Sequence, residues 1–303
     1  TYGIYWNQTH NGVNVTIPFT NDASLAGGYL QFQARSTTGG TWVPIGFRKI
    51  ITPAQVAAAA DLTYSFDTVT SIEDRTQPDG TTNVGGDNEQ EFGIDKIDGF
   101  GNDKVLYFRV MVADAAGNSI FSDASTSTLY VEERSPTINE VTSSSDNKAY
   151  KVADKINLQV VSTAVYAADP NMTITGIPQL KLETGAIADA VVNYTSGSGS
   201  KTLLFEYTVA TGHTSPDLNY FDVNSLTLNG GTIKDPYGNN VTLTLPALDN
   251  ANALKQKKDI EIDTTPPSVT FTYDDPDSLV RFEDGQLVIT ATFSDSIEFN
   301  TVP

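Results

Sequence analysis

The chain has 303 residues and a mass of 32.6 kDa, with 18 Lys and Arg against 37 Asp and Glu, a net charge of −19 and no Cys. Without Cys, no disulfide and no thiolate metal site can form. A charge of this sign repels a phosphate backbone, so we expect no nucleic-acid partner. No run of about 18 apolar residues occurs, so we expect no membrane span in this segment.

Alternating apolar and polar residues predict β-strands along most of the chain, because side chains of a strand point to opposite faces with a period of two. One helix is expected near 52–60, where Thr52 is an N-cap, Pro53 occupies the first turn and Gln55 completes a capping box. Short strands separated by turn residues are typical of β-sandwiches. The expected strands fall, in chain order, at 13–19, 30–34, 106–112, 156–160, 203–209, 241–245, 269–273 and 287–293.

An internal repeat divides the chain. Val131 and Glu132, followed by Pro136, recur as Ile262 and Asp263, followed by Pro267, at a spacing of 131 residues. A period near 130 residues fits one sandwich per repeat, and the extended, Pro-containing connection should hold neighbours end to end. We expect unit one at 1–133, unit two at 134–263, and the first strands of a further, incomplete unit at 264–303.

A five-residue motif also occurs twice, as Asp114–Asn118 and Asp235–Asn239, each time before the last strand of its unit. Asp accepts hydrogen bonds from the following backbone N–H groups, and the Gly can take a positive φ. Turn chemistry explains every residue of the motif, so we interpret both copies as structural turns.

Several segments of the chain share the pattern of a known type of repeat. In unit two they are 176–185, 194–199, 203–209, 225–239, 241–246 and 262–267, and in unit one they are 21–28, 107–110 and 114–118. On these residues the chain resembles the tandem immunoglobulin-like or cadherin-like repeats of large bacterial and archaeal surface proteins, such as adhesins and S-layer proteins. It departs from that pattern at His213, where an acidic or small residue is expected.

The resemblance implies an all-β protein of tandem immunoglobulin-like β-sandwich domains joined by short linkers. It also implies a secreted, extracellular piece of a large prokaryotic cell-surface polypeptide with a structural or adhesive role, in an S-layer, stalk, fibre or adhesin. The implied partners are neighbouring domains of the same chain, further copies in a lattice or fibre, and a cell-surface glycan or protein.

Candidate catalytic residues are few. The two His residues, His10 and His213, fall in different units, and no nucleophile-elbow, zinc-protease or phosphate-loop motif is present. We therefore expect a protein that is not an enzyme, with both His residues as exposed polar groups.

Calcium is the expected cofactor, because it takes six to eight oxygen ligands and carboxylates are abundant. The first place for it is a long loop at 73–104, where nine acidic and three basic residues sum to −6. The alternative is a solvated loop without an ion. The candidate ligands in the loop are Asp87, Glu89, Glu91, Asp95, Asp98 and Asp103.

The second place for calcium is the junction between units. Glu132 and Asp263 occupy equivalent positions, and Asp274, Asp275 and Asp277 follow in the opening hairpin of unit three. Facing carboxylates repel each other, so an ion between them would stiffen the array. The alternative is that these carboxylates stabilise turns at strand ends.

Two functions of other classes stay open. Unit one could be the carbohydrate-binding accessory region of a secreted enzyme, with Trp6 and its neighbours as a platform, although strand spacing favours core packing for Trp42. Unit one could also be catalytic, with its site in the acidic loop at 73–104.

Overall fold

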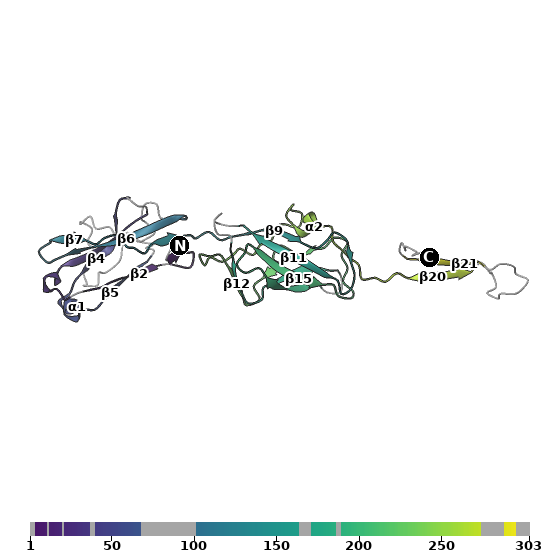
Figure 1. Ribbon diagram of the computed structural model, residues 1–303, viewed down its shortest axis with the longest axis horizontal. Helices are drawn as coiled ribbons and strands as arrows, with labels where there is room; N and C mark the ends of the chain where they lie inside the picture. The colour runs from purple at the N-terminus through teal and green to yellow at the C-terminus, as the bar shows by residue number, and fades with distance from the viewer. Residues whose placement is uncertain are drawn as a thin grey trace, which may run out of the picture.

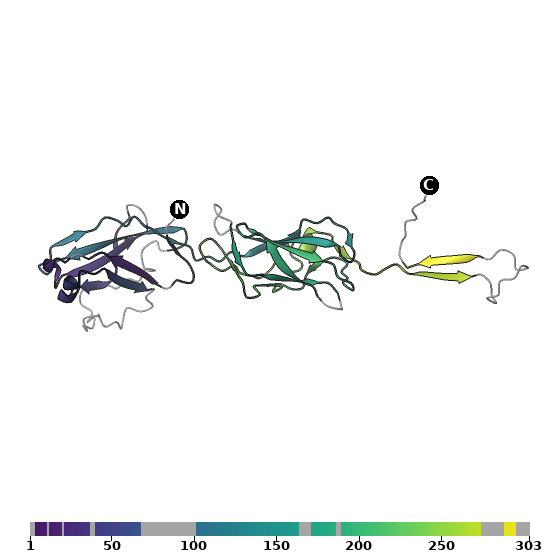
Figure 2. The ribbon, with the colours of Figure 1, turned by 60° about the horizontal axis from the view of Figure 1, so that its bottom comes forward.

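The computed structural model describes residues 4–10, 12–19, 21–36, 40–67, 101–163, 171–185, 189–273 and 288–294. These residues form many strands and only short helical segments, which confirms the all-β prediction. The groups of strands follow one another along the long axis of the molecule (Figure 1; Figure 2). No helix within the described ranges is long and apolar enough to cross a membrane.

Unit one contains two sheets that pack face to face. The larger has the strand order β1-β8-β6-β3-β4, with β7 paired to β6, and the smaller pairs β2 with β5. Val15 and Ile17 of β2 pack on the buried cluster around Trp6, Phe32 and Leu106. The elements are β1 (Ile4–Trp6), β2 (Gly12–Ile17), η1 (Ala23–Leu25), β3 (Tyr29–Arg35), β4 (Val43–Ile50), α1 (Pro53–Ala58), β5 (Leu62–Asp67), β6 (Lys104–Ala113), β7 (Ser119–Phe121) and β8 (Leu129–Val131).

The predicted helix forms where the sequence places it. The Thr52 hydroxyl accepts from the backbone N–H of Gln55 at 3.2 Å, and the Gln55 side chain accepts from the backbone N–H of Thr52 at 2.9 Å. These reciprocal bonds satisfy two donors at the start of α1, which therefore begins at Pro53 as expected.

Unit two has its own continuous core. Its main sheet has the order β16-β13-β14-β15-β11-β9, with β17 paired to β13, and β12–β18 and β10–β19 form two small sheets. One cluster of buried side chains, drawn from Ile138 to Ile262, fills the space between them. The elements are β9 (Ile138–Ser143), β10 (Ala149–Tyr150), β11 (Lys155–Ser162), β12 (Thr173–Thr175), β13 (Gln179–Glu183), β14 (Val191–Ser196), β15 (Thr202–Thr208), β16 (Asn219–Tyr220), β17 (Leu226–Thr227), β18 (Thr232–Lys234), α2 (Leu254–Lys257) and β19 (Glu261–Ile262).

One expected strand does not form. The run at 241–245 makes only an isolated bridge, between Thr242 and Thr137. Val241 and Leu245 are nevertheless buried, at 5% and 3% exposure. Their alternation therefore reflects burial on one side of an irregular segment whose backbone bonds go to separate partners: Val241 N–H donates to Ile233 and Leu245 N–H to Val223.

Beyond unit two lies a hairpin of β20 (Val269–Tyr273) and β21 (Ile289–Phe293). Phe271 pairs with Ala291 and Tyr273 with Ile289, so these apolar residues share one face. All residues of both strands are exposed. The expected strand at 287–293 begins outside the described residues.

In both units an early strand pairs in parallel with the last one. Trp6 of β1 is in register with Val131 of β8, and Tyr150 of β10 is in register with Ile262 of β19. This shared arrangement places equivalent residues at the ends of units one and two.

Candidate functional site at the junction of units one and two

The end of unit one forms a socket, by which we mean residues Trp6–His10 together with Glu132. The Glu132 backbone N–H donates to the Trp6 carbonyl at 2.8 Å, and so prolongs the β1–β8 pairing by one bond. Beyond Trp6 the chain turns back, with the His10 N–H donating to the Asn7 carbonyl at 3.0 Å and His10 Nδ1 accepting from the Asn7 N–H at 3.1 Å. The socket is thus a turn beside a strand end.

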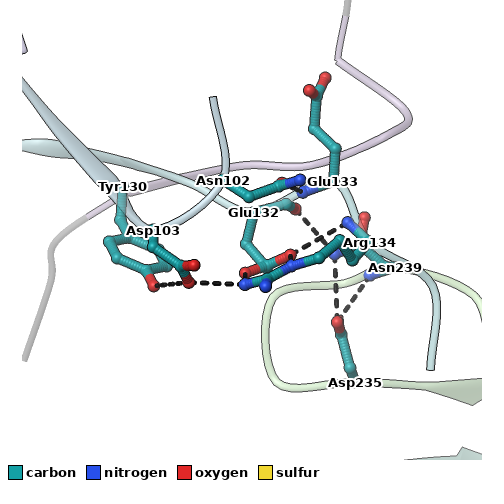
Figure 3. Close-up of polar contacts among 8 residues, drawn as sticks. All are labelled: Asn102, Asp103, Tyr130, Glu132, Glu133, Arg134, Asp235 and Asn239. Atoms are coloured by element: carbon teal, nitrogen blue, oxygen red, sulfur yellow. Dashed lines mark hydrogen bonds and ion pairs between the residues drawn. The ribbon is translucent and has the colours of Figure 1, made fainter. Parts of the chain in front are cut away.

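A buried carboxylate lies at the base of the socket. Glu132 is 0% exposed, and its Oε1 accepts from Arg134 Nε at 2.8 Å and from the Arg134 backbone N–H at 3.0 Å, while Oε2 accepts from Arg134 Nη2. Arg134 Nη2 also pairs with Asp103, to which the Tyr130 hydroxyl donates at 3.3 Å (Figure 3). A bidentate guanidinium is the arrangement that best offsets the cost of burying a carboxylate.

Unit two contributes a turn to the junction, residues Asp235–Asn239, which we call the docking turn. Asp235 Oδ1 accepts from the backbone N–H groups of Tyr237 at 2.9 Å and Asn239 at 2.7 Å, and Asp235 Oδ2 accepts from Asn239 Nδ2 at 3.1 Å. Gly238 has φ 89°. The turn has the predicted chemistry, and it presents the Asn239 amide at the junction.

The docking turn is bonded to unit one through three polar contacts. Asn239 Nδ2 donates to the Glu132 carbonyl at 2.7 Å, and Asn239 Oδ1 accepts from the Gln8 N–H at 2.9 Å (Figure 3 shows Asn239 facing the Glu132 backbone). Asn7 Nδ2 donates to the Tyr237 carbonyl at 2.8 Å. Asn239 is 0% exposed. The prediction of a structural turn is confirmed, and the Asn239 side chain in addition joins two units.

Aromatic packing and close approach complete the junction. The Tyr237 ring lies 5.1 Å from the Tyr5 ring and 5.4 Å from the Tyr130 ring, centroid to centroid. A Cβ added at Gly238 would lie 2.6 Å from Asn7 Nδ2. Gly238 is therefore required for two reasons, its positive φ and the close approach of unit one.

Burial distinguishes the two copies of the turn. It raises the pKa of Asp235, an effect that the nearby Glu132 adds to and the hydrogen bonds of the turn oppose. The side-chain hydrogen bond from Asn118 lowers the pKa of the equivalent Asp114, whose turn is exposed. Hydrogen bonds to Glu132 raise the pKa of the Arg134 guanidinium, which stays charged at any physiological pH.

The predicted metal ligands have mixed outcomes. Asp103 and Glu132 do come together, but the Arg134 guanidinium lies between them and supplies the positive charge expected of calcium, so their donor set does not fit that ion. Asp263 is exposed, and its Oδ1 accepts from the Thr265 N–H at 2.9 Å. Among the residues that the structure describes, no cluster of three or more His, Asp or Glu could hold a metal. Eight candidates lie outside those residues: Asp87, Glu89, Glu91, Asp95, Asp98, Asp274, Asp275 and Asp277.

The expected positions of the Trp residues need correction. Trp6 is 1% exposed, with its Nε1 donating to Glu133 at 3.1 Å, so it cannot serve as an exposed platform. Trp42 is only partly buried, and the Arg35 and Arg109 guanidinium carbons each lie 4.5 Å from its ring centroid. Arg35 Nε is a buried atom without a hydrogen-bond partner.

The two His residues also differ from each other. His10 is exposed, as expected, and serves as the acceptor in the socket. His213 is half-buried: its ring stacks on Tyr207 at 5.9 Å, and its Nδ1 lies 2.7 Å from the Tyr207 hydroxyl. Neither is part of a catalytic triad among the described residues.

Comparisons with known proteins add little. No family model matches the chain, and no curated protein matches it. Among solved structures it is similar to the native conformation of E. coli alpha-2-macroglobulin, with 8% sequence identity and a TM-score of 0.19, over 88% of this chain and 18% of that one. The chain thus spans less than a fifth of that protein, and a likeness this weak carries no argument.

Proposed function

We propose that this chain is part of a non-enzymatic, extracellular structural or adhesive protein, a prokaryotic surface polypeptide built from tandem immunoglobulin-like sandwiches. The observation that carries the proposal is the junction, where Glu132 and Asn239 are each 0% exposed and hydrogen-bonded across two units. Inter-domain motion is the ordinary expectation when little is buried between domains. A junction with buried, satisfied polar groups instead fixes the orientation of both units, which suits a load-bearing rod.

The geometry of the hydrogen bonds supports a fixed angle rather than mere contact. Asn239 uses both its donor and its acceptor on unit one, and Asn7 donates back to unit two. A rotation of one unit about the connecting segment would break all of these bonds together. Each buried group left unpaired would then cost about 1–3 kcal/mol.

Charge and composition suit a surface location. A net charge of −19 keeps a protein soluble and gathers cations from the medium. Calcium bound by the acidic loop at 73–104 stays part of the proposal, as a stiffener of unit one. At the junction itself, the positive charge that was expected of calcium comes from the Arg134 guanidinium.

The test is the relative orientation of units one and two in solution. In the parent chain, residual dipolar couplings from both units should fit one alignment tensor. Asn239→Ala removes the amide from the junction and should give each unit its own tensor, with a loss of about 2–3 kcal/mol in the free energy of unfolding. Asn118→Ala, in the exposed copy of the turn, is the matched control and should leave one tensor. Independent tensors in the parent chain would contradict the proposal.

A second candidate function, glycan binding, is favoured by one observation. Arg35, Arg109 and Trp42 form a cation–aromatic cluster on the outer face of the β3–β6 sheet, and Arg109 Nε is bonded to Gln33 at 2.7 Å. Guanidinium groups beside an aromatic ring suit a carboxylated sugar. Binding to an array of acidic glycans that Trp42→Ala abolishes and Trp6→Phe retains would support this role, and no binding by the parent chain would dismiss it.

A further inference from the structure

The larger sheet of unit one differs in charge from the chain as a whole. The chain has 18 Lys and Arg against 37 Asp and Glu, yet the strands of this sheet, β1, β3, β4, β6, β7 and β8, contain no Asp and no Glu. They contain the cationic residues Arg35, Arg48, Lys49, Lys104 and Arg109. A basic sheet in an acidic chain attracts anionic partners to one part of the molecule.

Two of these cations belong to a row of alternating rings and guanidinium groups. Arg35 Cζ lies 5.6 Å from the ring centroid of Tyr107 and 4.5 Å from that of Trp42. Arg109 Cζ lies 4.5 Å from the same Trp42 centroid and 4.0 Å from that of Phe121. We call these five residues the ladder, in the order Tyr107, Arg35, Trp42, Arg109 and Phe121. Contacts with two rings each restrain both guanidinium groups.

The ladder runs along β6 on the outer face of the sheet. Phe108 packs on the core of unit one, so its neighbours in β6 point outward. Arg35 is in register with Tyr107, and Phe121 is in register with Met111, four residues further along β6. Four residues of a strand span about 13 Å. The ladder is therefore an elongated surface rather than a single point of contact.

Among the residues that the structure describes, no carboxylate forms an ion pair with either guanidinium group of the ladder. Arg109 Nε donates to the uncharged Gln33 side chain at 2.7 Å, and Arg35 Nε is buried without an acceptor. Desolvation lowers the pKa of Arg109, and the charge of Arg35 lowers it further because like charges repel. Contact with the rings explains where the two groups lie, but it leaves their charge unneutralised.

The spacing of the two guanidinium groups determines which ligand can neutralise both. Their Cζ atoms each lie 4.5 Å from the Trp42 centroid, so about twice that distance, 9 Å, is the most that can separate them. A ligand with two or more carboxylates can give each guanidinium group its own bidentate partner. Once one carboxylate is bound, the next is held near the second guanidinium group at a high effective concentration.

The backbone of the sheet favours a ligand that is not a peptide. β3 pairs with β4 on one side and with β6 on the other, and β6 pairs with β3 on one side and with β7 and β8 on the other. A peptide strand adds to a sheet through unpaired backbone groups at an edge, and the ladder lies over strands that are not edges. Recognition at the ladder therefore comes from side chains, which suits the carboxylates and hydroxyls of an acidic polysaccharide.

We propose that the ladder binds a linear polysaccharide of repeating uronate sugars, with Arg35 and Arg109 each holding a different carboxylate. The guanidinium edges donate paired hydrogen bonds to the carboxylates, and Trp42 holds both groups at a fixed spacing. This inference rests on glycan binding as the second candidate function, and it names the ligand as a polymer rather than a single acidic sugar. It is independent of the junction between the units.

The test compares ligand lengths by isothermal titration calorimetry of the full chain. The probes are galacturonate as a single sugar, its linear tetramer, the methyl ester of that tetramer, and a capped peptide of four glutamates, which has the charge of the tetramer. The tetramer should bind at least about tenfold more tightly than the single sugar, because its second carboxylate binds within the same complex. The methyl ester should not bind. This comparison uses the parent chain alone, so it does not depend on how any variant folds.

Two variants assign the carboxylates to the guanidinium groups. Arg35→Gln and Arg109→Gln should each weaken tetramer binding about tenfold, the effect of losing one charge-assisted contact. Each should weaken single-sugar binding only about twofold, because the other guanidinium group still binds it. Lys201→Gln, at an exposed residue of unit two, makes the same change in net charge and should leave both affinities unchanged.

Equal affinities for the tetramer and the single sugar, or a tetramer affinity unaffected by both Arg substitutions, would overturn the inference while leaving glycan binding in place. Absence of binding by both sugars would overturn the glycan candidate as well. Equal binding of the tetramer and the glutamate peptide would show that the ladder responds to charge alone, which overturns the assignment to a polysaccharide. The residual dipolar couplings of units one and two test the structural role separately from all of these outcomes.

Discussion

Removal of the Arg134 guanidinium is the most direct test of the electrostatics of the junction. In Arg134→Met the side chain of Glu132 keeps its bond from the backbone N–H of residue 134 but loses those from Nε and Nη2. A buried ion pair that loses one partner is destabilised by about 3–5 kcal/mol. Arg134 is 40% exposed, so water can reach part of the space it leaves. We therefore expect a smaller loss, of about 2–3 kcal/mol.

The measurement is calorimetric unfolding of the full chain. A loss of about 2–3 kcal/mol should lower the melting temperature of unit one by about 10 °C. Asp103→Asn removes the second, solvent-exposed partner of Arg134, which has 42% side-chain exposure, and should cost less than about 1 kcal/mol.

The double variant Glu132→Gln/Arg134→Met decides between charge and packing. If the loss in Arg134→Met comes from an unpaired buried charge, neutralising Glu132 should recover stability to within about 1 kcal/mol of the parent chain. A loss below about 0.5 kcal/mol in Arg134→Met, or no recovery in the double variant, would refute the reasoning.

Three further predictions concern the turns and the acidic loop. Gly238→Ala should cost at least about 1 kcal/mol more than Gly117→Ala, because both strain the backbone but only the first approaches Asn7; equal losses in chemical denaturation would contradict this. Carboxyl-carbon NMR should give Asp235 a pKa above its ordinary value and Asp114 one below it. Because the folded pKa of Asp235 is raised, its contribution to stability is present at low pH and is lost as pH rises through that pKa. Because the folded pKa of Asp114 is lowered, its contribution is lost as pH falls. Excess calcium should raise the melting temperature of unit one and a chelator should reverse it, whereas an unchanged value means no site of useful affinity.

The helix and strands that depend on local chemistry could be predicted from the sequence. The capping box of Thr52 and Gln55 placed α1, and alternation placed β3, β6, β11 and β15, because a half-buried strand shows its period directly. Alternation wrongly predicts a strand at 241–245, because burial of one side of an irregular segment gives the same apolar–polar pattern as a paired strand.

The junction could be predicted only in part. The repeat identified Glu132 and Asp263 as equivalent, and the motif identified both turns. That Asn239 bonds to Glu132, 107 residues away, depends on how whole units pack, which no local pattern encodes. The same limit explains why calcium was expected at Glu132. The charge pattern shows a carboxylate, and Arg134 lies two residues along, but only the fold brings Asp103 to the same guanidinium.

The parallel pairing of β10 with β19 bears on how unit two would respond to tension. The chain enters the unit near Thr137 and leaves it after Asp263, at opposite ends of β11. A pull on both ends slides β10 and β19 past each other, so the bonds from Glu261 N–H to Lys148 and from Asp263 N–H to Tyr150 are loaded together. Bonds loaded in shear must break at once, whereas a hairpin pulled open from its ends yields one bond at a time. Unit two should therefore resist stretching by a single abrupt rupture rather than by gradual peeling.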